Sequence, residues 1–305
     1  MNKLRGKALP VTLSLFICTF TTARAAAEGL HGKEYWRKIR ANHYLVPEGE
    51  KAFPLAKELS GYLKVSDPEL RDDLAYSILA TWISGRDAFS GDELLALEAE
   101  WRGNLQAGIG ESGTDTIFGR SFSALCLSSI AERELKTPFL GEARYRTLLE
   151  AALDYLKDER DLRGFDAKKG WIHATAHTAD LLAALARHPS FTAQDQARVL
   201  KAIAQRIETA RVIFAFGEQD RLANVLAAMA GRRDFHAAGF ATWVFQMDKA
   251  DQSIWKDSPP QLDGLQRFEN DSYLLSAFVA RISEGQMSAA ATEARKAALK
   301  SLARR

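Results

Sequence analysis

The residues best able to do chemistry lie in one segment, 161–187, which reads DLRGFDAKKGWIHATAHTADLLAALAR. Asp180 is the only fully charged residue between positions 170 and 186. On a helix with about 100° per residue, His173, His177 and Asp180 fall on one stripe. A helix face in water usually carries Lys and Glu. Two histidines and an aspartate among apolar residues therefore indicate a polar face turned into the protein or into a groove.

A second nearly uncharged segment, 115–132, contains Arg120 as its only internal charge. A buried arginine is costly unless it meets a carboxylate or reaches water. The acids expected to pair with it are Asp180, Asp161 and Asp166. We therefore predict one ligand-binding pocket, lined by Arg120, Arg163, Trp171, His173, His177 and Asp180.

A metal site is one interpretation of the two histidines. His173 and His177 at i and i+4 on one helix face could both bind zinc, with Asp180 adding an oxygen ligand. However, metalloproteases with this spacing carry Glu directly after the first His, and Ala174 stands there. His173 and Asp180 would also lie two helical turns apart. The sequence thus predicts no metal or cofactor, with His173 and His177 as the only weak candidates for metal ligands.

Acid–base catalysis is a second interpretation. A histidine beside a carboxylate, with an arginine to hold an anionic group, would suit a hydrolase or a lyase. The candidate catalytic residues are His173, His177, Asp180 and Arg120. Nothing in the chain identifies a nucleophile, because neither a G-x-S-x-G motif nor a plausible Cys–His pair is present. The third interpretation is a buried polar network that fixes how neighbouring helices pack.

Two phrases of the sequence resemble the domain-of-unknown-function 2785 family. They are DTIFGRSFSAL at 115–125 and DLRGFDAKKGWIHATAHTADLL at 161–182. The resemblance covers about residues 70–245 and implies an all-helical fold without an assigned activity. It also implies that the following residues stand at the family's motif positions: Arg120, Arg163, Gly164, Gly170, Trp171, His173, His177 and Asp180.

The elements that would position these residues are all helices. Apolar residues recur with a period near 3.6, and alternating β-branched runs are absent. Ser90 with Glu93, Thr192 with Asp195, and Ser288 mark helix starts. The expected helices are 33–42, 50–64, 68–84, 91–106, 115–135, 142–158, 171–187, 193–213, 218–231, 235–249, 263–284 and 289–303. The expected core includes Phe214, Phe216, Phe240, Trp243 and Phe245.

Successive helix pairs start about 45–56 residues apart, close to the 40–47 residues of HEAT and armadillo repeats. The spacing predicts an all-α array of about six helix pairs, a HEAT- or armadillo-like solenoid or a curved array, with a compact bundle or a closed toroid as the alternatives. We expect one such domain over residues 26–305. Composition is ordinary for a globular protein, with 47% hydrophobic and 26% charged residues.

The first 25 residues have the layout of a secretory signal peptide. Basic residues precede an uncharged stretch at 8–22, and Ala23-Arg24-Ala25 follows as a cleavage pattern. The whole chain has a formal net charge of +2. Because residues 1–25 carry four basic residues and no acid, the cleaved chain would have a net charge of −2. A net charge of this size and sign does not indicate nucleic-acid binding. No membrane-spanning segment is expected after cleavage.

The sequence thus favours an exported protein, periplasmic or secreted, that acts as a binding or scaffold module. Its polar groove would centre on the segment GWIHATAHTAD. The expected partner is a protein, a peptide or a small anionic ligand. The alternative is the hydrolase or lyase described above.

Overall fold

The computed structural model describes residues 31–85, 88–282 and 287–305, and within them it is an all-α array, as predicted. The proposed signal peptide lies outside the described residues. At the N-terminal end, the helices are α1 (Lys33–Ala41) and α2 (Ala52–Tyr62). The first layer consists of η1 (Glu69–Tyr76), α3 (Ser77–Ser84), α5 (Thr116–Lys136), α7 (Ala174–Ala186), α9 (Glu218–Ala230) and α11 (Leu262–Ile282). The second layer consists of α4 (Gly91–Asn104), α6 (Gly141–Asp158), α8 (Ala193–Thr209) and α10 (Ala237–Ile254), and α12 (Ala289–Leu302) follows.

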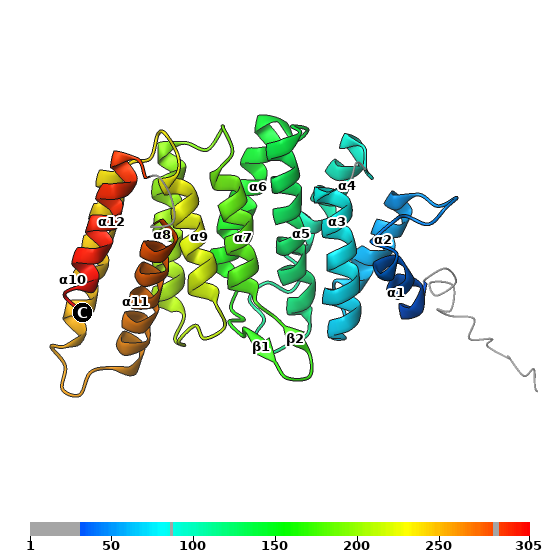
Figure 1. Ribbon diagram of the computed structural model, residues 1–305. Helices are drawn as coiled ribbons and strands as arrows, with labels where there is room; N and C mark the ends of the chain where they lie inside the picture. The colour runs from blue at the N-terminus through cyan, green and yellow to red at the C-terminus, as the bar shows by residue number, and fades with distance from the viewer. Residues whose placement is uncertain (1–30, 86–87, 283–286) are drawn as a thin grey trace, which may run out of the picture.

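The helices stand side by side in a row that runs from α1 and α2 at one end to α10 and α12 at the other (Figure 1). In the first layer α3 packs on α5, α5 on α7, α7 on α9, and α9 on α11. Helices α4 and α6 cover α5 and α7, and α12 packs against α10 and α11 at the end of the row. Apolar side chains from both layers form the core between them. In this stacking, each helix pair buries its apolar side chains against the neighbouring pairs.

Local signals explain where several helices begin. Ser90 accepts a hydrogen bond from the backbone of Glu93, and the Glu93 carboxylate bonds back to the Ser90 backbone. Thr192 and Asp195 form the same reciprocal cap on α8. The Ser288 hydroxyl caps α12. These three caps confirm the predicted helix starts.

The expected helix at 68–84 begins as a π-helix, η1, and continues as α3. Asp67 caps it, since its carboxylate accepts a hydrogen bond from the Leu70 backbone at 3.1 Å. The wider π turn changes which side chains share a face. Such turns are frequent at functional sites.

The expected helix at 171–187 begins later, at Ala174. Before it, β1 (Phe165–Asp166) pairs with β2 (Gly170–Trp171) in a short antiparallel hairpin. Gly170 has a φ of +73° and His173 a φ of +52°. These left-handed conformations turn the chain out of the hairpin, so the helical stripe of His173, His177 and Asp180 does not form as expected.

None of the helices in the described residues combines the length and the apolar character that a membrane crossing requires.

Candidate functional site

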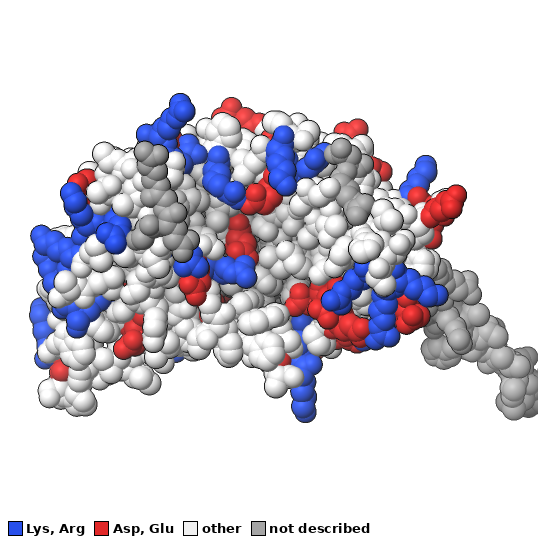
Figure 2. All heavy atoms as spheres, in the orientation of Figure 1, with Lys and Arg blue, Asp and Glu red and all other residues white. Residues whose placement is uncertain are grey.

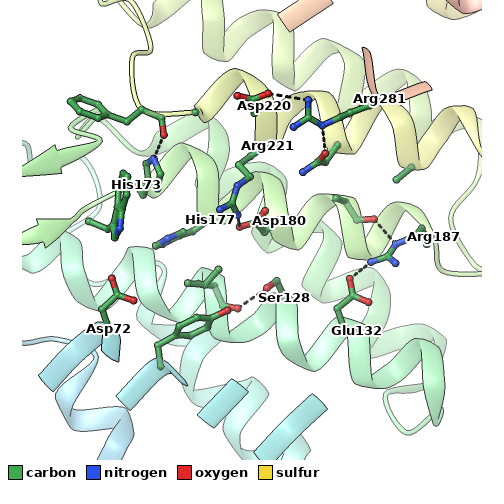
Figure 3. Close-up of a pocket in the computed structure, with 18 residues that line it drawn as sticks. Asp72, Ser128, Glu132, His173, His177, Asp180, Arg187, Asp220, Arg221 and Arg281 are labelled. Carbon is green, nitrogen blue, oxygen red and sulfur yellow. Dashed lines mark hydrogen bonds and ion pairs between the residues drawn. The ribbon is translucent and has the colours of Figure 1, made fainter. Parts of the chain in front are cut away.

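A cleft of about 1150 Å³ opens on the first layer of helices (Figure 3). We call it the central cleft. Its walls come from η1, α5, α7, α9 and α11, with the hairpin and the segment before α9 at one end. The lining residues with polar or aromatic side chains are Asp72, Tyr76, Ser128, Glu132, Trp171, His173, His177, Asp180, Arg187, Phe216, Asp220, Arg221, Asn224 and Arg281. In Figure 2, acidic and basic side chains lie close together in the middle of the face in view.

Arg71 anchors the hairpin that supplies one end of the cleft. Its guanidinium is fully buried and donates hydrogen bonds to the carbonyls of Lys169 at 2.6 Å and Trp171 at 3.1 Å. It also lies 4.0 Å from the ring centroid of Phe118, a cation–π contact. Burial lowers the Arg71 pKa to about 10. Hydrogen bonds from this buried guanidinium group therefore hold the hairpin against η1.

His173 lies at the turn between β2 and α7 and is nearly buried. Its ring stacks on Trp171 with centroids 4.5 Å apart. Nε2 donates a hydrogen bond to the Phe216 carbonyl at 2.8 Å and lies 3.8 Å from Glu218 Oε1. Burial lowers the His173 pKa despite the Glu218 charge, so the ring is neutral at pH 7.

His177 lies one turn into α7, and its ring meets that of His173 edge to face with centroids 5.6 Å apart. The Ser121 hydroxyl donates to the Ile172 carbonyl, so it must accept from His177 Nδ1, which lies 2.8 Å away. The Ser121 carbonyl, at 3.2 Å, is a second acceptor for the same proton. Burial lowers the His177 pKa well below its usual range, which keeps this tautomer neutral.

Three ion pairs line the middle and the far end of the central cleft. Asp180 pairs with Arg221 at 2.5 Å, and Arg281 pairs with Asp220 at 2.9 Å. Arg187 pairs with Glu132. Their side chains converge on the cleft from α5, α7, α9 and α11 (Figure 3). Burial raises the Asp180 pKa, and the Arg221 charge only partly offsets it.

Asp72 differs from the other acids of the cleft. Within the described residues, its carboxylate makes no hydrogen bond or ion pair. Burial raises its pKa, although the charge of Arg71 opposes the shift. Figure 3 places it at the same end of the cleft as His173 and His177. This end therefore carries a carboxylate without a partner.

The structure places Arg120 away from the central cleft, contrary to the expected pairing with Asp180, Asp161 or Asp166. Its fully buried guanidinium binds the Glu159 carboxylate through Nε at 2.6 Å and Nη2 at 3.3 Å. The expected constellation of His173, His177, Asp180 and Arg120 is thus not formed. Arg120 lies on the side of α5 that faces the start of the 159–164 segment.

Arg163 is also outside the cleft lining. It binds Asp161 at 2.5 Å and the Thr114 carbonyl at 2.8 Å, so it fixes the two loops to each other. Of the six predicted pocket residues, Trp171, His173, His177 and Asp180 line the central cleft. Asp166 instead accepts hydrogen bonds within its own hairpin turn.

The predicted zinc interpretation depends on ligand spacing. In the part of the chain that the structure describes, no three His, Cys, Asp or Glu side chains are grouped closely enough to hold one metal ion. His173 and His177 use one nitrogen each on protein partners. What the arrangement can do is present neutral imidazoles, carboxylates and guanidinium groups to a ligand in one cleft.

Several residues of the cleft are not among the six pocket residues predicted from the sequence. Arg221 and Arg281 looked like ordinary charges on solvent-facing helix surfaces, and Asp72 sat in an acidic run. Phe216 and Phe245 were expected in the core, but they are 45% and 60% exposed. Gly217, with a φ of +90°, was the available signal, since it marks a turn that presents Phe216 before α9.

Residues 105–279 match the model of the family described as protein of unknown function (DUF2785). The match begins and ends later in the chain than the expected 70–245. It includes every polar or aromatic cleft residue named above except Asp72, Tyr76 and Arg281. No curated protein and no solved structure matches the chain.

Proposed function

Because the chain belongs to the DUF2785 family, whose matched region supplies most of the central cleft, we propose that it is a binding module. Its ligand is an extended peptide segment of a partner protein, held along α7 and α9. The observation that carries the proposal is the cleft itself, where side chains of both charges and exposed aromatic rings meet across five helices.

The size of the cleft favours a peptide over a compact small molecule. Pockets for small ligands usually enclose about 300–1,000 Å³. The central cleft measures about 1150 Å³ and stays open along the first layer. Stacked helix pairs generally offer extended surfaces of this kind to peptides and proteins. A chain of several residues would fill it better than a single small molecule.

The charges of the cleft suit a ligand with charges of its own. Arg187 and Arg281 are both partly exposed, at 46% and 29% of the side-chain surface. Partly exposed ion pairs contribute only about 0–1 kcal/mol. Such pairs can be exchanged for contacts with ligand side chains at little cost in stability.

The aromatic end provides an anchor for an apolar side chain. Trp171 and Phe216 both line the cleft and are 40% and 45% exposed. Phe165 extends this surface, with its ring centroid 5.0 Å from that of Trp171. Aromatic residues of this kind dominate the binding energy of many interfaces.

The test is a selection of peptides from a random displayed library on the purified protein. Enriched peptides should bind Arg187→Ala at least roughly fivefold more weakly than wild type in calorimetry. Arg198→Ala is the matched control, because Arg198 is similarly exposed and paired with Glu150 but does not line the cleft. If no peptide is enriched, or if both variants bind like wild type, the proposal is wrong.

Export is proposed on the sequence of residues 1–25, with one domain over 26–305 and a periplasmic or secreted location. Cell fractionation and the mass of the purified chain test it. A protein found in the cytoplasm with its first 25 residues intact would contradict it.

A further inference from the structure

The central cleft has an uneven distribution of charge. Its lining includes four carboxylates and three guanidinium groups. Each of the three arginines has an acidic partner, namely Asp180, Asp220 or Glu132. The remaining acid of the lining is Asp72, which has no ion-pair partner among the lining residues and lies at the end that also holds His173 and His177 (Figure 3). The buried Arg71 charge, outside the lining, only partly offsets the effect of burial on Asp72.

We propose that this end of the cleft binds a primary ammonium group, from the amino terminus of a bound peptide or from a lysine side chain. The inference rests on the proposed function and names the chemistry of one end of its ligand. Asp72 supplies the opposite charge, the two imidazoles supply hydrogen-bond acceptors, and Trp171 supplies an aromatic surface.

The tautomers of the two histidines make them acceptors. His173 Nε2 carries the proton that it donates to the Phe216 carbonyl, so Nδ1 has a free lone pair. His177 Nδ1 donates to Ser121, so Nε2 has the free lone pair. Neither free nitrogen has a hydrogen-bond partner in the described residues. His177 is only 5% exposed and lines the cleft, so its Nε2 is available to a ligand bound there.

An ammonium group matches these acceptors better than other ligands do. It has one positive charge and three N–H donors. A carboxylate or phosphate would bring negative charge to the unpaired Asp72, and Arg221, the cation nearest the two histidines in the lining, is already paired with Asp180. A metal ion needs ligand atoms about 2.0–2.2 Å from one point, and no such cluster of three exists in the described residues. Hydrogen bonds from an ammonium group are about 2.7–3.2 Å long, so its acceptors can lie farther apart than the ligands of a metal ion.

Trp171 adds a second attraction for a cation. Its ring is 40% exposed at this end of the cleft. Cations gain favourable energy over the face of a tryptophan ring. The aromatic surface that Trp171 shares with Phe165 and Phe216 also suits an apolar side chain next to the ammonium group.

The probes are small molecules, so the test does not need a known peptide. Phenylalanine amide carries a free α-amino group beside an aromatic ring, and Nα-acetyl-lysine amide carries only the side-chain ammonium. N-acetyl-phenylalanine amide is the uncharged control. Binding at about pH 6.5, where both amines are protonated, is followed by NMR of the tryptophan indole N–H groups, with Trp171→Phe assigning the relevant signal.

We expect millimolar binding of at least one ammonium probe, as suits a ligand of this size, and the stronger one identifies the source of the group. The uncharged control should bind at least roughly tenfold more weakly. Asp72→Asn should weaken binding by a similar factor. Asp73→Asn is the matched control, because Asp73 is the next residue of η1, is exposed and does not line the cleft.

The inference is overturned if neither ammonium probe shifts the Trp171 signal, if the uncharged control binds equally well, or if Asp72→Asn binds like wild type. These outcomes would overturn the ammonium site and can be distinguished from outcomes that would overturn the peptide-binding function. If library peptides bind through the cleft and acetylation of their amino and lysine groups changes nothing, the binding module stands and only the ammonium site is wrong.

Discussion

Replacing Glu159 with alanine should destabilise the protein far more than replacing any acid of the central cleft. The Glu159 side chain is 2% exposed and that of Arg120 is 0% exposed. The two groups share two hydrogen bonds, and Glu159 Oε1 also accepts from the Asp161 backbone at 2.9 Å. Without the carboxylate, Arg120 keeps only the Ala107 carbonyl and the Thr116 hydroxyl as acceptors.

The magnitude follows from the burial of the charge. Breaking a buried ion pair by removing one partner costs about 3–5 kcal/mol, because the other charge stays uncompensated. The lost bond to the Asp161 backbone adds about 1 kcal/mol. If both partners are replaced, as in Arg120→Met with Glu159→Leu, the uncompensated charge is gone. The double variant should therefore be more stable than Glu159→Ala by about 2 kcal/mol or more.

Urea denaturation followed by circular dichroism measures these differences in the free energy of unfolding. Glu150→Ala is the matched control, since Glu150 also pairs with an arginine, Arg198, but is 51% exposed. It should cost about 0–1 kcal/mol. If the free energy of unfolding of Glu159→Ala falls by less than about 1 kcal/mol, Arg120 must reach water or another acceptor, and the expected cost of an unpaired buried charge is wrong.

Three further perturbations test other parts of the account. Asp180→Ala should cost no more than about 1 kcal/mol in thermal unfolding, because Arg221 is 44% exposed and can turn to water; a loss of several kcal/mol would mean that this pair is structural. Burial and a neighbouring carboxylate raise the pKa of Asp271 well above its usual range, so its contribution to stability is full below about pH 3.9 and is lost as pH rises. The stability of Asp271→Asn to urea should therefore rise relative to that of wild type as pH increases above about 3.9, and a difference in stability that does not change with pH would contradict the raised pKa. Gly164→Ala should cost about 1–3 kcal/mol in urea unfolding, because a Cβ there would overlap the Phe216 ring; unchanged stability would mean that the ring moves freely.

Most of the fold could be predicted from the sequence because its signals are local. Helix caps such as Ser90 and Thr192 act within four residues, and apolar periodicity indicates the buried face of each helix. The predicted helix starts agree with the structure except near the hairpin. There, Gly170 and His173 adopt left-handed conformations that helical periodicity does not reveal.

The candidate site was predictable only in part because its other residues come from distant segments. His177 and Asp180 share α7, so their spacing indicated a common face. Arg221 reaches Asp180 from α9, 41 residues away in sequence. Nothing in the sequence distinguishes Arg221 from other exposed arginines.

The partner of Arg120 was missed for a similar reason. Glu159 follows the end of α6, where an acid looks like an ordinary solvent-facing residue. The fold buries its carboxylate against Arg120 of α5. Such a pairing depends on how helices pack, which helical periodicity within one segment does not specify.

The most direct test of the binding proposal is a structure of the protein with the tightest peptide from the library selection. The account predicts that the peptide lies in the central cleft along α7 and α9, with a primary ammonium group at Asp72. A peptide bound elsewhere, for instance in the groove between α8 and α10 beside Trp243, would contradict it.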